Sequence, residues 1–486
     1  MIRKIYFLII LFIFVIFGYE VNAQDMKIWT LEECIEYGLA NNLTIKRSEF
    51  SVTDNEILLR QSKAAYYPTL NAGGQYQNLW GRSIDPTTNL FSTDRIETMG
   101  IQGSSSWTLY QGRSIRNSVK QNRVDLQGSE YDLQRVKNDI MLDVTTGFLT
   151  LILNTELFEN AKVQLETTKA QLETTSKQVR AGALPMSSEL DLIAQVESNE
   201  VAVINADNDV RLAKLNLQQT MLMPSGEEFD VDIPEIELDI LEPVLLSSEQ
   251  IYQESINIMP QIKSAEKSVE SADLGIKIAH GLLEPRVYAQ ANIYTNYSSV
   301  TSSRRYNYDS NGDPIYIEVP LGYYYNPSGI PEPVYTQIQE FETSEGIGPQ
   351  LNDNISQSVA LTLSIPIFNG LQNRTYYQRA KIQSNQARTY SEEAKLALRQ
   401  SIELAYNNAS AASKSYNASL KQVASLEESF RAAEKSYNLG AMNIYDYQVA
   451  SNNLFRARSD LLRAKYNYIF TVKVLDFYLG KPLSLD

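Results

Sequence analysis

Two stretches in each half of the chain alternate between apolar and polar residues. Alternation with a period of two puts apolar side chains on one face of a β-strand and polar side chains on the other. The pattern predicts strands at residues 68–80, 99–110, 287–293 and 358–367. A strand of a soluble sandwich shows the same alternation, so the pattern alone does not place these strands in a membrane.

Long helices are expected after each pair of strands. Residues 371–439 contain neither Gly nor Pro, and residues 113–181 contain no Pro. At about 1.5 Å per residue, such segments predict helices on the order of 100 Å long. In the partner segments 187–221 and 446–478, apolar residues recur every seven positions. A seven-residue repeat is typical of a left-handed coiled coil, so each pair of segments predicts an antiparallel helical hairpin.

The two halves of the chain share one pattern. At an offset of 217 residues, the helix-capping segment that begins at Thr30 matches the one that begins at Ser247. At an offset of 258 residues the matching pairs are Gly112 with Gly370, Gly182 with Gly440 and Pro224 with Pro482. We therefore expect two structural repeats, residues 24–223 and 247–486, each ordered helix (30–65 in the first), strand, loop, strand, long helix, turn, long helix. The alternative is two unrelated helical stretches that share only a heptad pattern.

Two segments stand outside this repeat. Because the offset grows by 41 residues, the second repeat carries a longer loop, residues 298–354, which is rich in Tyr, Gly and Pro. We expect it to be an enlarged extracellular loop. Residues 224–246 join the two repeats. Within them, Pro224–Val244 holds eight acidic residues and no basic one, which predicts a solvated acidic linker.

The N-terminus has the pattern of a secretory signal. Arg3 and Lys4 precede 13 consecutive apolar residues, 5–17, and small residues precede a cleavage site after Ala23. We therefore expect residues 1–23 to be a signal peptide, the alternative being a retained anchor. Since no later stretch approaches 18 consecutive apolar residues, the exported protein is expected to enter a membrane only as strands.

Composition excludes several classes of function. With 43 Lys and Arg against 58 Asp and Glu, the net charge of −15 argues against nucleic-acid binding. Cys34 and His280 are the only residues of their types, which excludes an intramolecular disulfide, a thiolate cluster and a multi-His zinc site. Paired carboxylates of a polysaccharide hydrolase are the remaining enzymatic option, but no pocket signature surrounds any pair. We predict no catalytic residue, no metal site and no cofactor.

Four strands cannot close a barrel by themselves. In hydrocarbon each unpaired backbone group at a sheet edge costs several kcal/mol, so a spanning sheet must close. Subunits that contribute four strands each would give barrels of 8, 12 or 16 strands. Aromatic residues fall at the ends of the predicted strands, where interfacial girdles belong, although they could instead fill a soluble core. They are Tyr66, Tyr67, Trp80, Tyr110, Tyr297 and Phe368.

With these features the chain resembles the TolC-like outer membrane efflux proteins, the outer membrane factors. The resemblance is carried by the duplicated plan, by the strand-to-helix junction Ser364–Gly370 (SIPIFNG), and by Gly440 six residues before Asp446. The segment 107–112 is a weaker copy of the junction that lacks its proline. The resemblance implies an α+β membrane protein of a Gram-negative outer membrane. Its trimer would form a 12-stranded barrel continued by a periplasmic coiled-coil tunnel.

The same resemblance implies a function and its sites. The trimer would passively conduct substrates in a tripartite efflux or secretion system, with the hairpin tips docked on a periplasmic adaptor and an inner-membrane pump. The predicted adaptor contacts are Arg180, Gly182, Ala183, Leu184, Met186, Leu439, Gly440, Ala441, Met442 and Ile444. The predicted gate residues are Asp446, Asp191 and Glu189, although each could simply be a favourable acid near a helix N-terminus. The competing hypothesis is a structural or adhesive periplasmic coiled-coil protein without a channel.

Overall fold

The computed structural model describes residues 28–484 except 85–88, 90, 94, 225–228, 235–245, 300–302 and 345, so the expected signal peptide lies outside the described residues. The chain divides into two compact units, which we call the helical unit and the sheet unit. The helical unit comprises Met1–Glu56, Val124–Glu270 and Asn385–Asp486, and the sheet unit comprises Ile57–Arg123 and Ser271–Ser384.

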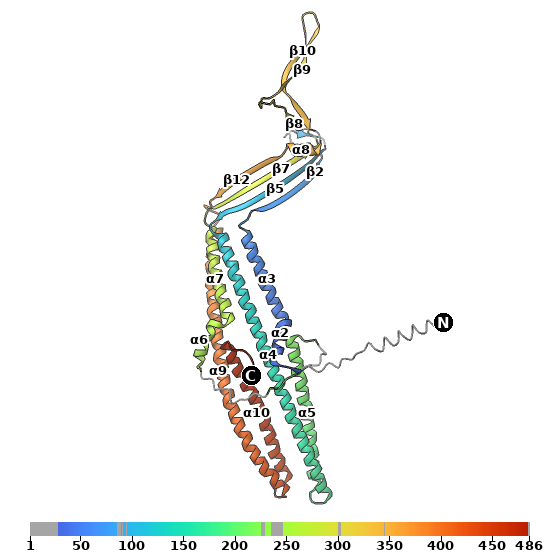
Figure 1. Ribbon diagram of the computed structural model, residues 1–486, viewed down its shortest axis with the longest axis vertical. Coiled ribbons are helices and arrows are strands. Elements are labelled where there is room, and N and C mark those ends of the chain that lie inside the picture. Colours follow the sequence, from blue (N-terminus) through green and yellow to red (C-terminus); the bar gives the residue numbers. More distant parts are fainter. Residues whose placement is uncertain are drawn as a thin grey trace, which may run out of the picture. The chain divides into compact units, whose positions relative to one another are not determined.

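A four-stranded antiparallel sheet forms the centre of the sheet unit. Its strands are β2 (Thr69–Leu79), β5 (Ile96–Gln111), β7 (Arg286–Ser298) and β12 (Ser356–Ser364). They lie in the order β12-β7-β5-β2 (Figure 1). All four predicted strands are confirmed. The strand β12 ends earlier than expected, two residues before Pro366, because a proline has no amide hydrogen to donate to a neighbouring strand.

Residues 298–354, expected to be a loop, contain regular structure. The segment holds β8 (Ser303–Tyr306), β9 (Tyr316–Tyr325), β10 (Pro331–Gln339), β11 (Phe341–Ser344) and the helix α8 (Ile347–Asp353). The strand β9 pairs with β10, and β8 with β11, both antiparallel. The many Gly and Pro residues obscured the alternation of Ile317, Val319 and Leu321 that makes a strand. The shorter segment between β2 and β5 holds β3 (Ser83–Ile84) and β4 (Phe91–Ser92).

Four long helices form two hairpins. The outgoing helices, α4 (Ser114–Arg180) and α9 (Gln372–Asn438), each have 67 residues. The returning helices, α5 (Met186–Met221) and α10 (Ile444–Tyr478), have 36 and 35 residues. Figure 1 shows α4 beside α5 and α9 beside α10. The predicted helices are confirmed within a few residues, and their equal lengths follow from the repeated sequence.

Each repeat begins with two helices instead of the single helix expected. In the first repeat α2 (Leu31–Asn41) and α3 (Leu43–Ala64) are separated by Asn42. In the second, α6 (Ser248–Ile258) and α7 (Pro260–Gly281) are separated by Met259. Met259 is extended because a proline disfavours helical backbone at the residue before it. At the equivalent joint, the side chain of Asn42 accepts a hydrogen bond from the Thr44 amide at 2.8 Å.

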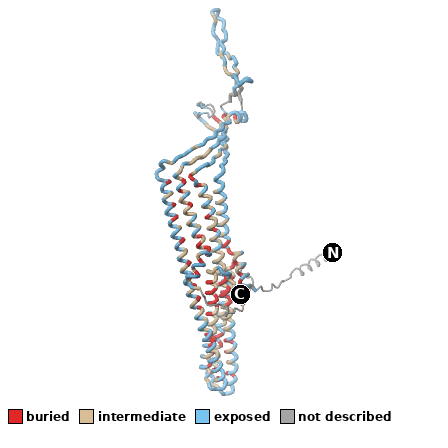
Figure 2. Tube along the Cα trace, turned by 60° about the vertical axis from the view of Figure 1, so that its left-hand side comes forward, coloured by how far each residue is buried: buried red, intermediate tan, exposed pale blue. Residues whose placement is uncertain are grey.

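The core of the helical unit contains two large clusters of apolar side chains and a small third one around Tyr468, and Figure 2 shows buried positions gathered on the helices. The first joins α2, α4, α5 and α10, and it includes Cys34, Phe148, Ile152 and Leu217. The second joins α6, α7, α9 and α10 around Ile402. By length and composition α4 is apolar enough to cross a membrane. Its buried residues in the first cluster account for part of that apolar character.

The acidic linker is partly packed against the rest of the chain where it is described. Phe229 is fully buried, and the short strand β6 (Asp230–Val231) pairs in parallel with β1 (Ile28–Trp29). The high count of carboxylates drew attention away from the apolar residues between them. The expected solvation is therefore wrong for Phe229 and Val231, whereas Asp230 and Asp232 are exposed. Residues 225–228 and 235–245 lie outside the described part of the chain.

Candidate channel wall and hairpin tips

The register of the sheet sorts its side chains onto two chemically different faces. Across the strands, Leu70 lies opposite Ser105, Ser105 opposite Ala291, and Ala291 opposite Val359. Neighbours two residues away extend the same face. It is mainly apolar and includes Leu70, Tyr76, Met99, Ile101, Trp107, Val287, Ala289, Ile293, Val359, Leu361 and Leu363.

The opposite face of the sheet is polar, and among the described residues its one charged side chain is Arg286, at the start of β7. The uncharged side chains of this face include Asn71, Gln75, Gln77, Gln102, Ser104, Ser106, Thr108, Tyr288, Gln290, Asn292, Tyr294, Asn296, Ser358 and Thr362. A cleft of about 370 Å³ lies on this face, lined among others by Gln75, Gln102 and Tyr294. Amides and hydroxyls both donate and accept hydrogen bonds, so the part of this face beyond Arg286 can be wetted without selecting ions by fixed charge. An apolar face opposite a polar one is the arrangement of a membrane barrel wall.

The predicted aromatic girdle residues lie on the surface of the chain. Tyr66, Tyr67, Trp80, Tyr110 and Phe368 are exposed, and Tyr297 is partly exposed. They do not fill a soluble core, which was the alternative. Trp107, which the sequence analysis did not single out as an interfacial residue, donates its indole N–H to the Tyr66 carbonyl at 2.8 Å.

Each outgoing helix follows its strand through a left-handed turn. Gly112 and Arg113 have φ of 53° and 60°, and Gly370 and Leu371 have φ of 63° and 66°. Glycine suits this backbone because it has no Cβ to clash. At Gly112 a Cβ would also lie 2.2 Å from the Gly281 carbonyl oxygen, whereas nothing lies within 4 Å of the same position at Gly370. The first junction is therefore packed tightly against the end of α7, and the second is open.

A polar seam runs between the two hairpins in the helical unit. The Gln164 amide donates to Asn452 at 3.1 Å, and Asn452 donates to Gln195 at 3.4 Å. The Gln195 amide in turn donates to the Asn199 side-chain oxygen at 2.9 Å, and the Asn199 amide donates to the Thr168 hydroxyl on α4 at 2.8 Å. The sequence analysis did not identify these residues. The signal was present, because Asn199 is a buried polar residue three positions after Val196 in an otherwise apolar heptad seam.

The seam is incompletely satisfied. Among the described residues, Gln164 Oε1, Gln171 Nε2 and Gln448 Nε2 are buried without a hydrogen-bond partner. Nearer the tips, Thr175 and Tyr437 share a hydrogen bond at 3.2 Å, and the ring of Tyr437 stacks on Tyr447. Burial, followed by the nearby Glu434, raises the pKa of Tyr447 to about 12.

The two hairpin tips have the same backbone turn. Gly182 and Gly440 both have φ of 72°. In the first tip the Ala183 amide donates to the Gln178 carbonyl, and in the second the Ala441 amide donates to the Ser436 carbonyl, both at 2.9 Å. With the Gly182 and Gly440 amides also bonded back to the helix, each tip is a Schellman motif. The two glycines therefore terminate the outgoing helices in the same way, as their matching positions in the two repeats predict.

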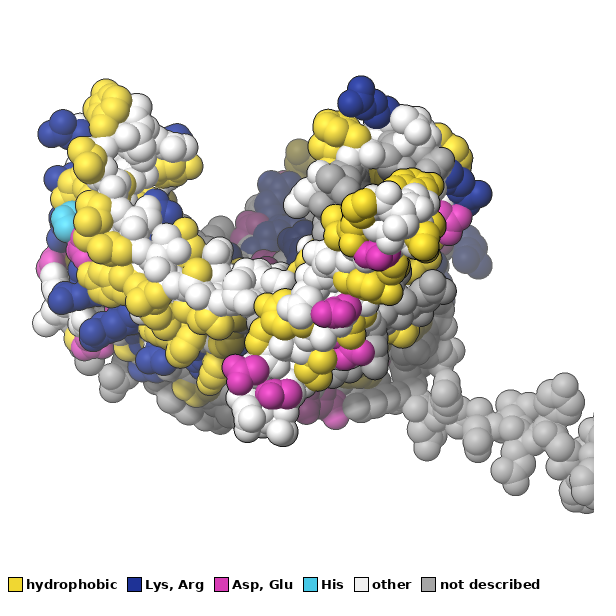
Figure 3. Space-filling view, turned by 90° about the horizontal axis from the view of Figure 1, so that it is seen from above, with side chains coloured by type: hydrophobic (Ala, Val, Ile, Leu, Met, Phe, Trp, Pro, Cys, Tyr) yellow, Lys and Arg dark blue, Asp and Glu magenta, His cyan; other side chains and the backbone are white. Residues whose placement is uncertain are grey.

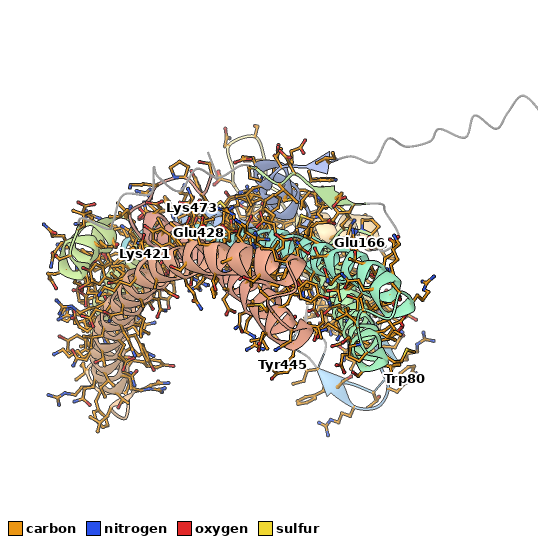
Figure 4. All side chains as sticks on the ribbon, turned by 90° about the horizontal axis from the view of Figure 1, so that it is seen from below. Trp80, Glu166, Lys421, Glu428, Tyr445 and Lys473 are labelled. Atoms are coloured by element: carbon orange, nitrogen blue, oxygen red, sulfur yellow. The ribbon has the colours of Figure 1, made fainter. Side chains whose placement is uncertain are left out.

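The predicted contact residues differ in exposure. Among the apolar ones, Met186 and Leu439 are exposed, whereas Leu184, Met442 and Ile444 are only partly exposed. Arg180, Gly182, Ala183, Gly440 and Ala441 are exposed. Tyr445, which the sequence analysis did not select, is 70% exposed and lies near the start of α10, on the side of its hairpin away from Glu428 (Figure 4).

The three predicted gate acids have different surroundings. Asp446 is exposed, and its carboxylate accepts from the Asn443 side chain at 2.8 Å while its amide donates to Asn443 at 2.9 Å. Asn443 is the N-cap of α10, and this reciprocal pair holds the Asp446 side chain at the N-terminus of the helix. Glu189 is partly buried and accepts a hydrogen bond from Ser176. Asp191 is exposed and has no hydrogen bond or ion pair with the described residues.

The described residues contain no group of three or more His, Cys, Asp or Glu side chains that could hold a metal ion. Cys34 is buried. His280 is exposed, and its Nδ1 atom lies 3.5 Å from the Glu284 Oε1 atom.

Sequence comparison places the chain among known proteins. The profile of the family described as "Outer membrane efflux protein" matches residues 35–221 and 251–481. The outer membrane protein TolC of Escherichia coli (strain K12) is 29% identical over 147 residues, which are 30% of this chain and 30% of TolC. TolC of Salmonella enteritidis is 27% identical over 130 residues. The match thus spans about a third or less of the length of these curated relatives.

Solved structures resemble the chain over nearly its whole length. VceC of Vibrio cholerae, an outer membrane protein, superposes with a TM-score of 0.72 at 14% identity, covering 93% of this chain and 97% of VceC. The outer membrane channel MtrE of Neisseria gonorrhoeae, solved in its open state, superposes with a TM-score of 0.68 at 18% identity, covering 94% and 90%. The predicted fold class is confirmed by these likenesses.

Proposed function

Because this chain belongs to the outer membrane efflux protein family, as predicted, we propose that it is the outer membrane channel of a tripartite efflux or secretion system. It receives substrates from an inner-membrane pump and a periplasmic adaptor and conducts them passively. Family membership places the chain in the outer membrane, with a helical extension in the periplasm. The observation that carries the proposal is the sheet, which combines an apolar face, a polar face made mostly of uncharged side chains, and two edge strands.

The free edges require other copies of the chain. Among the described residues, β2 and β12 each pair with only one strand of the sheet. A sheet in lipid must close, and four strands are too few, so three copies would close a barrel of twelve strands. The apolar face then contacts lipid, and the polar face lines the lumen.

Apolar stripes on the helices support the same assembly. Leu190, Val201 and Leu212 recur every 11 residues on α5, and so do Ile193, Ile204 and Leu215. All six are exposed in the single chain. An 11-residue repeat keeps an apolar face along a nearly straight helix. We assign this stripe to contacts between neighbouring copies, because a lone chain in water would expose it at a cost.

The hairpin tips are assigned to the adaptor. Met186 and Leu439 place exposed apolar side chains beside well-formed turns, where solubility alone would favour polar ones. Of the three acids proposed for the resting gate, Asp191 fits best, since it is exposed and unpaired among the described residues. Glu189 and Asp446 also bind local partners. Efflux of a defined drug measures the role of the gate acids, and capture of adaptor by the purified channel measures the role of the hairpin tips.

A pair of neighbouring substitutions in β12 tests the channel directly. Lysine at Leu361 faces lipid and is expected to cost about 2–4 kcal/mol near the bilayer midplane, so Leu361→Lys should assemble poorly. Lysine at Thr362 faces water, so Thr362→Lys should assemble normally and shift the conductance of planar bilayers toward anions. A structural coiled-coil protein without a channel predicts no conductance from either variant or from the wild type. That result would overturn the proposed function.

A further inference from the structure

The helix ends that adjoin the sheet are strongly basic in an otherwise acidic protein. Four segments flank one end of the four strands: residues 57–68, 112–123, 271–286 and 365–384. Together they contain eleven Lys and Arg but only two acidic residues, Asp273 and Glu284, although the whole chain carries a net charge of −15. We call these segments the basic collar. A cluster of positive charge at one end of the strands indicates a negatively charged partner.

Part of the basic collar lines a cleft of about 510 Å³ between α4 and α7. From α4 it is lined by Arg113, Arg116 and Lys120, whose spacing of three and four residues puts them on one face of the helix. From α7 it is lined by Lys277 and His280. The four Lys and Arg side chains belong to exposed residues, so a solute can reach them.

The positive charge of this cleft is not neutralised within the chain. Among the described residues, no ion pair joins an acid to any of the four Lys and Arg side chains. The acid in the cleft, Glu284, accepts a hydrogen bond from the Tyr110 hydroxyl at 2.5 Å and lies 3.5 Å from His280. The cleft also contains the first turn of α4, whose free amide hydrogens add partial positive charge. A phosphate or other anion would pair with the four Lys and Arg side chains and accept hydrogen bonds from the first-turn amides of α4.

The cleft opens on the lipid-facing side of the sheet. Tyr110 lies opposite Val287, which belongs to the apolar face, and it is Tyr110 that contacts Glu284 in the cleft. Figure 3 looks down on the sheet and shows hydrophobic side chains along its convex side, with some of the Lys and Arg side chains at the left of that side. An anion bound here would therefore lie where the apolar face ends, at the level of lipid head groups.

We propose that this cleft binds the phosphate of an anionic phospholipid head group in the leaflet next to the helices, with Arg113, Arg116, Lys120 and Lys277 as its cationic contacts. The lipid tails would lie along the apolar face of the sheet, which free phosphate cannot use. This inference rests on the proposed insertion of the sheet into the outer membrane. Clusters of basic residues beside a membrane span are a recognised means of holding anionic lipids.

The test compares lipids retained by the full chain after extraction from vesicles of equal parts phosphatidylglycerol and phosphatidylcholine. Wild type should retain phosphatidylglycerol preferentially. The triple variant Arg113→Gln, Arg116→Gln and Lys120→Gln should bind it about fivefold more weakly for each charge removed. The control Lys414→Gln, Lys421→Gln and Arg456→Gln removes the same charge from exposed positions in the helical unit and should retain the preference. The charge-conserving double variant Arg113→Lys and Arg116→Lys should retain most of the preference for phosphatidylglycerol.

Three outcomes overturn the proposal: equal retention of the two lipids, an unchanged preference in the triple variant, and full displacement by inorganic phosphate. Equal retention of both lipids by wild type, or an unchanged preference in the triple variant, shows that the cleft does not select an anionic head group. Full displacement of bound phosphatidylglycerol by millimolar inorganic phosphate shows a free-phosphate site instead. If the triple variant does not assemble, the wild-type comparison and the phosphate competition still decide. A channel that conducts but shows no lipid preference overturns this inference alone, whereas a chain that never enters vesicles overturns the proposed function.

Discussion

Gly112 and Gly370 occupy matching positions in the two repeats, yet their surroundings differ. Both need a left-handed backbone, so alanine strains each by roughly 1–2 kcal/mol. At Gly112 the new methyl group would also collide with the backbone of Gly281. We predict that Gly112→Ala lowers the midpoint of thermal unfolding clearly more than Gly370→Ala does. Equal shifts in the two variants would show that the tight contact at the first junction is absent.

A second prediction at the residue scale concerns alkaline pH. The folded pKa of Tyr447, about 12, lies above the ordinary value of 10.0 because the phenol is buried. The neutral phenol therefore contributes stability that is fully present below pH 10 and is lost as pH rises toward 12. Between pH 9 and 11.5, the wild type should lose more thermal stability than Tyr447→Phe. If both lose the same amount, the ring is not buried in the folded tip.

Residue roles were harder to predict than residue positions. The spacing from the turn glycine to Asp446 is evident in the sequence, but its bond with Asn443 depends on where α10 begins. One residue more or less at that boundary would change the cap. Similarly, the identity of Gly112 is explained by Gly281, which is 169 residues away and invisible to local pattern analysis.

At the scale of elements, the polar seam between the hairpins is predicted to cost stability. Gln171 and Gln448 each bury an amide nitrogen without a partner in the described structure. Leaving a buried polar group unsatisfied costs about 1–3 kcal/mol. We predict that Gln171→Met and Gln448→Met each raise the midpoint of thermal unfolding. A lower midpoint in both would mean that these amides are satisfied, for example by buried water.

The hairpin tips give a prediction about partners. Glutamate at Leu439 and Met186 would place charge on the surface proposed to meet the adaptor, so the double variant Met186→Glu and Leu439→Glu should abolish efflux and adaptor capture. Val163→Glu is a matched control, because Val163 is similarly exposed but lies on α4 outside the tip. Normal efflux by the double variant, at normal levels of channel, would rule out this surface.

The elements were predictable where one period dominated their sequence. The strands β2, β5, β7 and β12 and the four long helices follow directly from periods of two and seven residues. The joint at Met259 depends on one proline, the joint at Asn42 on one asparagine side chain, and the strands within 298–354 stand in a background rich in Gly and Pro, so none of them follows from periodicity alone. The 11-residue repeat of α5 is also present in the sequence, but its exposure appears only in the structure.

At the scale of the whole molecule, one protomer is incomplete. Among the described residues, its sheet has two unpaired edges, its apolar face is uncovered, and the stripe on α5 is exposed. These three features belong to different elements, and assembly of three copies in a membrane satisfies all of them. The edge problem follows from the number of strands and the apolar face from their alternation, so both could be derived from the sequence, whereas the exposure of the stripe on α5 could not.

The number of subunits in the membrane-extracted protein tests this account most directly. Native mass spectrometry of the mature chain, released from detergent micelles, should give a species of three subunits that loses its compactness on heating. A single subunit that is stable in water without detergent would contradict the account, because such a chain would have no need to close its sheet with other copies.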